Sequence, residues 1–187
     1  MIATVQGSRH VKGSNVIDLV KFVKTLQKRG PLPPLSPAAE QLLEARLLNS
    51  TWYAFEPFVE LLQVVDKLVL RSDEGRAMEM GVVGGTVALQ GPAKLYLQPN
   101  DPRATVVAMR HAWRARHDFA DLVASMDGDR AVRFTLSDYP DISMVHALTT
   151  AGWGIAAARA AGSTLASLDV LERPWRGASS FCYRINY

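Results

Sequence analysis

The sequence predicts an α+β protein with a helical N-terminal half, followed by a ββαββ antiparallel sheet packed on helices. Apolar residues recur at helical spacing up to about residue 113, whereas the runs after residue 118 mostly alternate between apolar and polar. An Asp127-Gly128 pair separates the first two of these runs, which is typical of a β-hairpin. Strands joined by hairpins favour an antiparallel sheet with helices over one face. A chain of 187 residues fits a single domain, 1–187.

The first helix is expected from the helical spacing of apolar residues over 16–26. Ser14 or Asn15 can cap its N-terminus, because a short polar side chain there accepts from an unpaired backbone N–H. Gly30 is a plausible stop for the helix. The dozen residues before it predict a short strand or a tether.

Four further helices are expected before the hairpin. Ser36-Pro37 combines a capping hydroxyl with a proline whose missing N–H costs nothing in the first turn. A third helix with an apolar stripe is expected over 55–70, and residues 72–74 mark the start of a fourth. Pro102 can start a helix that reaches Trp113.

The fourth helix carries Gly81, Gly84 and Gly85. Each glycine costs a helix about 1 kcal/mol relative to alanine, so three together indicate that another backbone comes close. Tight packing within the chain is the first interpretation. A contact with a second copy of the chain, or with a ligand, is the alternative.

The C-terminal half alternates with a period of two residues, apart from one long alanine-rich segment. If Asp127-Gly128 forms a two-residue turn, both residues need a positive φ. Asp138 and Asp141 are expected to serve as a turn residue and a helix cap. The expected strands are 119–126, 130–139, 165–172 and 179–187, and the expected helix is 142–161.

Composition excludes several classes of protein. The apolar fraction of 48% is that of a globular chain, and a net charge of +3 is too small to indicate nucleic-acid binding. Cys182 is the single cysteine, so neither a disulfide framework nor a cysteine zinc site is expected, and a cytoplasmic location fits. No signal-peptide pattern begins the sequence, and no apolar run is long enough for a membrane span.

The candidate site residues are histidines and aromatic side chains. His111 and His117 lie near the end of the helix before the hairpin, among arginines. They indicate either an anion site, with His111 as a possible haem or metal ligand, or a solvated basic helix end that suits the helix dipole. Trp113 could stack on a ring, or it could be a core aromatic residue.

His146 lies on the long helix near Ser143, but the nucleophile motif Gly-x-Ser-x-Gly is absent and no third orienting group is evident. The sequence also lacks the His-x-x-x-His spacing and any clustered carboxylates typical of a metal site. We therefore expect neither an enzyme nor a metal site.

The chain resembles a superfamily that includes haem-NO-binding domains, 4-vinyl reductase domains and TRAPP subunits. Within it, the chain is most similar to uncharacterised haem-NO-binding-like proteins of myxobacteria. The resemblance covers most of the chain, and no single motif in it is specific. The residues that carry it are Val11-Lys12-Gly13-Ser14, Trp113, Asp138-Tyr139-Pro140, Gly152-Trp153-Gly154, Gly162, Leu171-Glu172-Arg173, Gly177 and the aromatic segment 181–187.

The resemblance implies a regulatory or sensory module that binds a small apolar ligand between the helical half and the sheet. Haem-NO-binding domains hold haem with a histidine and a Tyr-x-Ser-x-Arg motif, and this motif is absent here. No cofactor is therefore expected, although haem bound through His111 or His146 stays open. A ligand-free homodimeric scaffold is the alternative, with its interface at the glycine helix or at the edge of the closing strand. The candidate ligand-binding residues are His111, Trp113, Tyr139, His146 and Trp153.

Overall fold

The computed structural model describes residues 8–139 and 141–187 and confirms the predicted α+β class. A wide helical turn, Asp66–Leu70, extends the third helix, and short 3-10 turns lie at Pro92–Tyr96 and Pro174–Arg176. The helices are α1 (Gly13–Gln27), α2 (Pro37–Glu44), α3 (Phe55–Val65), α4 (Glu74–Leu89), α5 (Pro102–Arg114) and α6 (Met144–Ala160). The strands are β1 (His10–Lys12), β2 (Trp52–Ala54), β3 (Asp121–Met126), β4 (Ala131–Ser137), β5 (Ser167–Glu172) and β6 (Phe181–Asn186).

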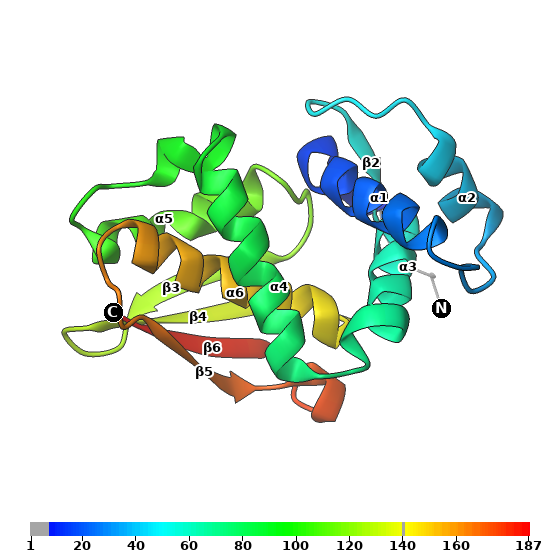
Figure 1. Ribbon diagram of the computed structural model, residues 1–187. Coiled ribbons are helices and arrows are strands. Elements are labelled where there is room, and N and C mark those ends of the chain that lie inside the picture. The colour runs from blue at the N-terminus through cyan, green and yellow to red at the C-terminus, as the bar shows by residue number, and fades with distance from the viewer. Residues whose placement is uncertain (1–7, 140) are drawn as a thin grey trace.

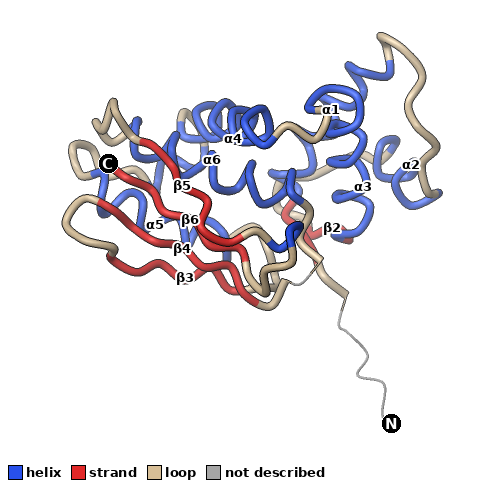
Figure 2. The backbone as a smooth tube through the Cα atoms, turned by 90° about the horizontal axis from the view of Figure 1, so that it is seen from below, coloured by secondary structure: helices blue, strands red, loops and turns tan. Residues whose placement is uncertain are grey.

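The larger sheet has the strand order β3-β4-β6-β5, and each neighbouring pair is antiparallel (Figure 2). The closing strand β6 therefore lies inside the sheet, and the expectation that its edge is free for a partner is wrong. The sequence pattern marks β6 as a strand but does not give its place in the order. Phe134, Phe181 and Tyr183 stack on the buried face of the sheet, which explains the aromatic character of this segment.

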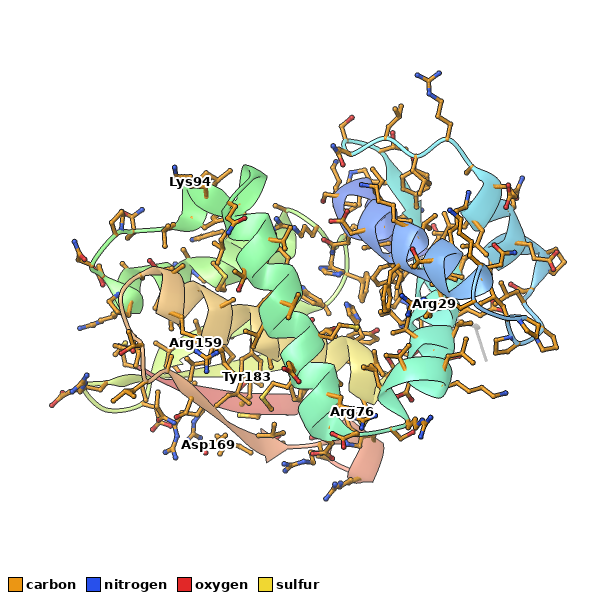
Figure 3. All side chains as sticks on the ribbon, in the orientation of Figure 1. Arg29, Arg76, Lys94, Arg159, Asp169 and Tyr183 are labelled. Atoms are coloured by element: carbon orange, nitrogen blue, oxygen red, sulfur yellow. The ribbon has the colours of Figure 1, made fainter. Side chains whose placement is uncertain are left out.

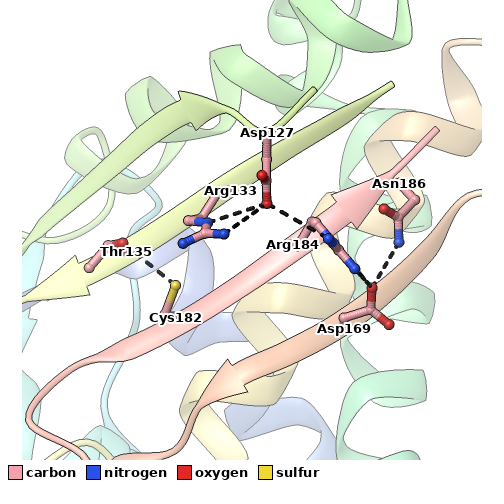
Figure 4. A network of polar contacts seen from close by, with 7 residues as sticks. All are labelled: Asp127, Arg133, Thr135, Asp169, Cys182, Arg184 and Asn186. Atoms are coloured by element: carbon pink, nitrogen blue, oxygen red, sulfur yellow. Dashed lines mark hydrogen bonds and ion pairs between the residues drawn. The ribbon is translucent and has the colours of Figure 1, made fainter. Parts of the chain in front are cut away.

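The opposite face of the sheet is polar (Figure 4). Arg133 pairs with Asp127 at 3.1 Å, and Arg184 pairs with Asp169 at 2.8 Å. Tyr183 lies on the helix side of the sheet, whereas Asp169 lies on the outer side (Figure 3). Alternation along each strand thus produces one apolar and one charged face.

Helix α4 packs closely on α6, which lies over the sheet (Figure 1). A Cβ atom at Gly81 would overlap the backbone of Thr149, and one at Gly85 would come within 3.0 Å of the Trp153 backbone. Gly81 and Gly85 are buried in this contact, so they are not a surface for a second chain, and that alternative is wrong for these two positions. Gly84 is exposed.

Helices α1–α3 and the small antiparallel sheet β1-β2 form the first part of the helical half, ahead of α4 and α5. Helix α1 begins after Lys12 without a side-chain cap, so the expected caps at Ser14 and Asn15 are wrong. The chain instead enters α1 directly from β1, and the N–H of Gly13 donates to the carbonyl of Thr51 at 2.8 Å. The strand β2 has no clear signal in the sequence.

The β3–β4 hairpin turns through four residues, 127–130, rather than two. Within it only Gly128 has a positive φ, of 85°, so the expected two-residue turn is wrong although the hairpin itself is present. Helix α6 is capped by Ser143, whose side chain accepts from the N–H of His146, and not by Asp141. Among the described residues, no helix is both long and apolar enough to span a bilayer.

Candidate functional site: a buried aromatic–histidine cluster

Seven rings from distant parts of the chain meet where the N-terminal helices contact the C-terminal half. We call them the aromatic–histidine cluster. Six of the seven residues are at most 6% exposed, and Phe119 is partly buried. The cluster consists of Phe55 and Phe58 of α3, Trp113 of α5, His117 and Phe119 of the segment after α5, Tyr139 of the segment before α6, and His146 of α6.

His117 lies among the rings of Phe55, Trp113, Phe119 and His146. Its ring stacks on Trp113 with centroids 3.7 Å apart and an interplanar angle of 18°. Burial lowers the pKa of His117 well below its usual range, and the nearby His146 lowers it further, so the ring is neutral at neutral pH. Its Nδ1 lies 3.3 Å from the carbonyl oxygen of Trp113. A carbonyl only accepts, so Nδ1 carries the proton and Nε2 carries a lone pair.

That Nε2 atom is buried and has no hydrogen-bond partner in the described part of the chain. Buried polar atoms without partners are uncommon, because desolvation without a compensating hydrogen bond costs about 1–3 kcal/mol. Nε2 of His117 is therefore a buried acceptor that a donor group of a ligand would satisfy.

The second histidine is paired. Nδ1 of His146 lies 3.0 Å from the hydroxyl of Tyr139, and burial lowers the pKa of His146 to about 3. Burial also raises the pKa of Tyr139, so the hydroxyl keeps its proton. The centroids of the His117 and His146 rings are 5.3 Å apart. Both histidines are consequently neutral, and the cluster carries no charge of its own.

Arg9 lies between the cluster and solvent, over three of its rings. Its guanidinium carbon lies 5.2 Å from the ring centroid of Phe55, 5.5 Å from Phe119 and 5.7 Å from Tyr139. The same group pairs with Asp141 at 2.7 Å. An open pocket of about 510 Å³ begins here, and Arg9, Phe55 and Tyr139 line it. The pocket and the cluster thus share two rings.

Three of the five candidate residues, Trp113, Tyr139 and His146, come together in this cluster. His111 does not, because it lies on the exposed face of α5 next to Arg110. Trp153 lies on the α4 side of α6, where the Arg116 guanidinium is 4.8 Å from its ring centroid. His111 and Trp153 are therefore not part of the cluster.

The other four members, Phe55, Phe58, His117 and Phe119, are not among the ligand-binding residues that the sequence predicts. The sequence predicts for His117, as for His111, an anion site or a solvated helix end, whereas in the structure His117 is 6% exposed and forms a β-bridge with Val11 of β1. One signal was present, because His117 follows Trp113 by four residues, the spacing at which side chains meet on one helix face. Phe55 lies in the apolar stripe of α3, which gives no indication of what the stripe contacts.

The cluster does not fit a haem. His117 could supply a nitrogen ligand, but Trp113 covers its ring, and the rings of Phe55, Phe119 and His146 have centroids within 6.5 Å of it. The described residues that line the open pocket include no histidine. Among the residues that the structure describes, no three His, Cys, Asp or Glu side chains are grouped to hold a metal ion.

Comparison with solved structures identifies the fold. One similar structure comes from work on haem redox potential and porphyrin distortion, with a TM-score of 0.62, 12% identity and coverage of 94% of this chain and 99% of that chain. An oxygen-binding H-NOX domain related to soluble guanylate cyclases has a TM-score of 0.60, with 12% identity and 94% of both chains covered. The unliganded Fe(II) H-NOX protein of K. algicida has a TM-score of 0.57 and 14% identity, covering 94% of this chain and 95% of that chain.

No family model matches the sequence, and no curated protein does. The chain has the α+β fold of haem-NO-binding (H-NOX) domains. At 12–14% identity, the likeness establishes the fold alone.

Proposed function

We propose that this protein is a non-enzymatic regulatory module that binds a small, mainly apolar ligand at the aromatic–histidine cluster, without haem. The observation that carries the proposal is the buried, neutral His117 with its unpartnered Nε2 atom. A ligand with an apolar body and one hydrogen-bond donor would satisfy this nitrogen and be enclosed by aromatic rings.

Access to the cluster runs through the open pocket. Phe55 lines this pocket, and its ring centroid lies 6.5 Å from that of His117. Rotation of Phe55 would let a ligand pass from the pocket to His117. The volume of about 510 Å³ is within the range of small-molecule sites, about 300–1,000 Å³.

A matched pair of probes tests the proposal. Phenol carries a hydroxyl donor, whereas anisole has a similar shape and no donor. We expect phenol to shift the His117 ring signals in NMR spectra and to bind about fivefold more tightly than anisole, because one hydrogen bond contributes about 1 kcal/mol. Native mass spectrometry of protein purified from cells would identify the natural ligand.

Two variants control this experiment. His117→Leu should lose the preference for phenol, whereas His111→Leu, at an exposed position on α5, should keep it. Equal affinity for phenol and anisole in the wild-type protein would refute the role of His117, and so would a preference that survives in His117→Leu.

A ligand-free homodimeric scaffold is a second candidate, and one observation favours it. Val83 and Val87 on the outer face of α4 are each 60% exposed, next to the exposed Gly84. Adjacent exposed apolar side chains of this kind can mark a protein contact. Sedimentation would show a dimer that Val87→Glu dissociates. A monomer at all concentrations would exclude this candidate.

A further inference from the structure

Arg9 occupies a cage built from three separate segments of the chain. Phe55 comes from the start of α3, Phe119 from the segment after α5, and Tyr139 from the segment before α6. The guanidinium carbon lies 5.2–5.7 Å from these three ring centroids. Cations within about 6 Å of a ring centroid are attracted by the negative face of the ring.

Two carboxylates complete the cage. Asp141 accepts two hydrogen bonds from Arg9, at 2.7 and 2.9 Å, in a bidentate pair. Glu56 accepts two more from the other side, at 3.3 and 3.4 Å. The hydrogen bond from Arg9 holds the pKa of Asp141 below its usual range, so the carboxylate is ionised at neutral pH. Aromatic faces together with carboxylates are the chemistry that selects a planar or alkylated cation.

The charge of the neighbouring pocket also favours a cation. The wall contains the carboxylates of Glu56, Glu60 and Asp141 and the cations Arg9 and Lys67. Glu60 accepts from the N–H and the hydroxyl of Ser36, both at 2.6 Å. With Arg9 in the cage, three carboxylates of the described lining face two cations; if Arg9 leaves, they face Lys67 alone, and the net negative charge of the lining increases.

Arg9 is also accessible from solvent. Its side chain is 26% exposed, and the open pocket borders it directly. Arg9 precedes β1, a strand of three residues. An external cation therefore competes with the side chain of Arg9, which belongs to a short extended segment and not to a helix.

We propose that this cage is a binding site for a small guanidinium or alkylammonium compound, and that Arg9 is an internal ligand that occupies the site until such a compound displaces it. Arg9 then acts as a tethered competitor, which sets the ligand concentration at which the site responds. The cage shares Phe55, Phe119 and Tyr139 with the cluster, but this inference does not depend on the ligand proposed for His117, because it rests on the ring faces and carboxylates around Arg9 and not on Nε2 of His117.

Methylguanidinium chloride at millimolar concentration tests the proposal, with sodium chloride at the same ionic strength as reference. In Arg9→Ala the cage is vacated, and we expect methylguanidinium to raise the thermal unfolding midpoint. In the wild-type protein, binding should be at least about tenfold weaker, because the tethered Arg9 competes. In the wild-type protein, displacement should also move the Nε–H NMR signal of Arg9 to the position of a free arginine.

Arg114→Ala is the matched control. Arg114 pairs with Asp121 at 3.1 Å on the surface, but none of the described aromatic rings forms a cage around it. The proposal is overturned if Arg9→Ala responds no more than Arg114→Ala, or if sodium chloride produces the same shift. Should Arg9→Ala fail to fold, the wild-type titration decides, and an Arg9 signal unmoved at saturating methylguanidinium would refute displacement.

Discussion

Acid should destabilise this protein through its buried histidines. Burial lowers the pKa of His146 from 6.5 to about 3. A histidine that is harder to protonate in the folded state contributes stability that is complete above its unfolded pKa, near 6.5. That stability is lost as the pH falls from 6.5 toward 3. His117 acts in the same direction, because burial also lowers its pKa.

The size of the effect follows from the shift. One pKa unit corresponds to about 1.4 kcal/mol, so His146 alone should cost about 2 kcal/mol of the free energy of unfolding between about pH 7.5 and about pH 5. This is a large part of the roughly 5–15 kcal/mol that stabilises a typical domain. The charged groups that act on the cluster are the cations Arg9 and Arg116 and the anions Asp141 and Glu56, and Arg116 opposes protonation of His117.

The assay is urea unfolding followed by tryptophan fluorescence at several pH values. The informative variant is Tyr139→Phe/His146→Phe, which removes the histidine together with the hydroxyl that it would leave unpaired. The double variant should lose about 2 kcal/mol less than the wild-type protein on acidification. His111→Ala, at an exposed position, should leave the loss unchanged. Equal losses in the double variant and the wild-type protein would refute the reasoning, as would NMR titration of His146 near pH 6.5.

Two further predictions concern stability. Gly81→Ala should lower the free energy of unfolding by about 3 kcal/mol or more, because the added Cβ would overlap the Thr149 backbone and force α4 away from α6. Gly84→Ala, at an exposed position of the same helix, should leave the stability unchanged or raise it. Thermal unfolding of both variants measures the difference. Ser36→Ala removes the cap of α2 and the hydroxyl bonded to Glu60, so chemical denaturation should show a loss of about 1–2 kcal/mol; an unchanged midpoint would contradict the capping role.

The order of helices and strands was predictable because it depends on local patterns. Alternation in β4 and β6, and helical periodicity in α1 and α3, reflect which side of each element faces the core. The predicted cap at Ser36 is confirmed, and it is predictable because capping involves residues only three positions apart. The prediction is wrong where a distant segment replaces the local partner: at the start of α1 no side chain caps the helix, and the N–H of Gly13 donates to the carbonyl of Thr51.

The candidate site likewise combines features that the local sequence predicts with features that depend on distant segments. The sequence by itself marked Trp113, Tyr139 and His146 as residues to follow, and it supplied the two glycines that let α4 approach α6. Only the tertiary structure decided that His117 is buried, that His111 is exposed, and that Arg9 reaches Asp141 across 132 residues of chain. Periodicity reports which face of an element is buried. It carries no information about which distant side chains meet there, because that depends on the packing of whole helices and strands.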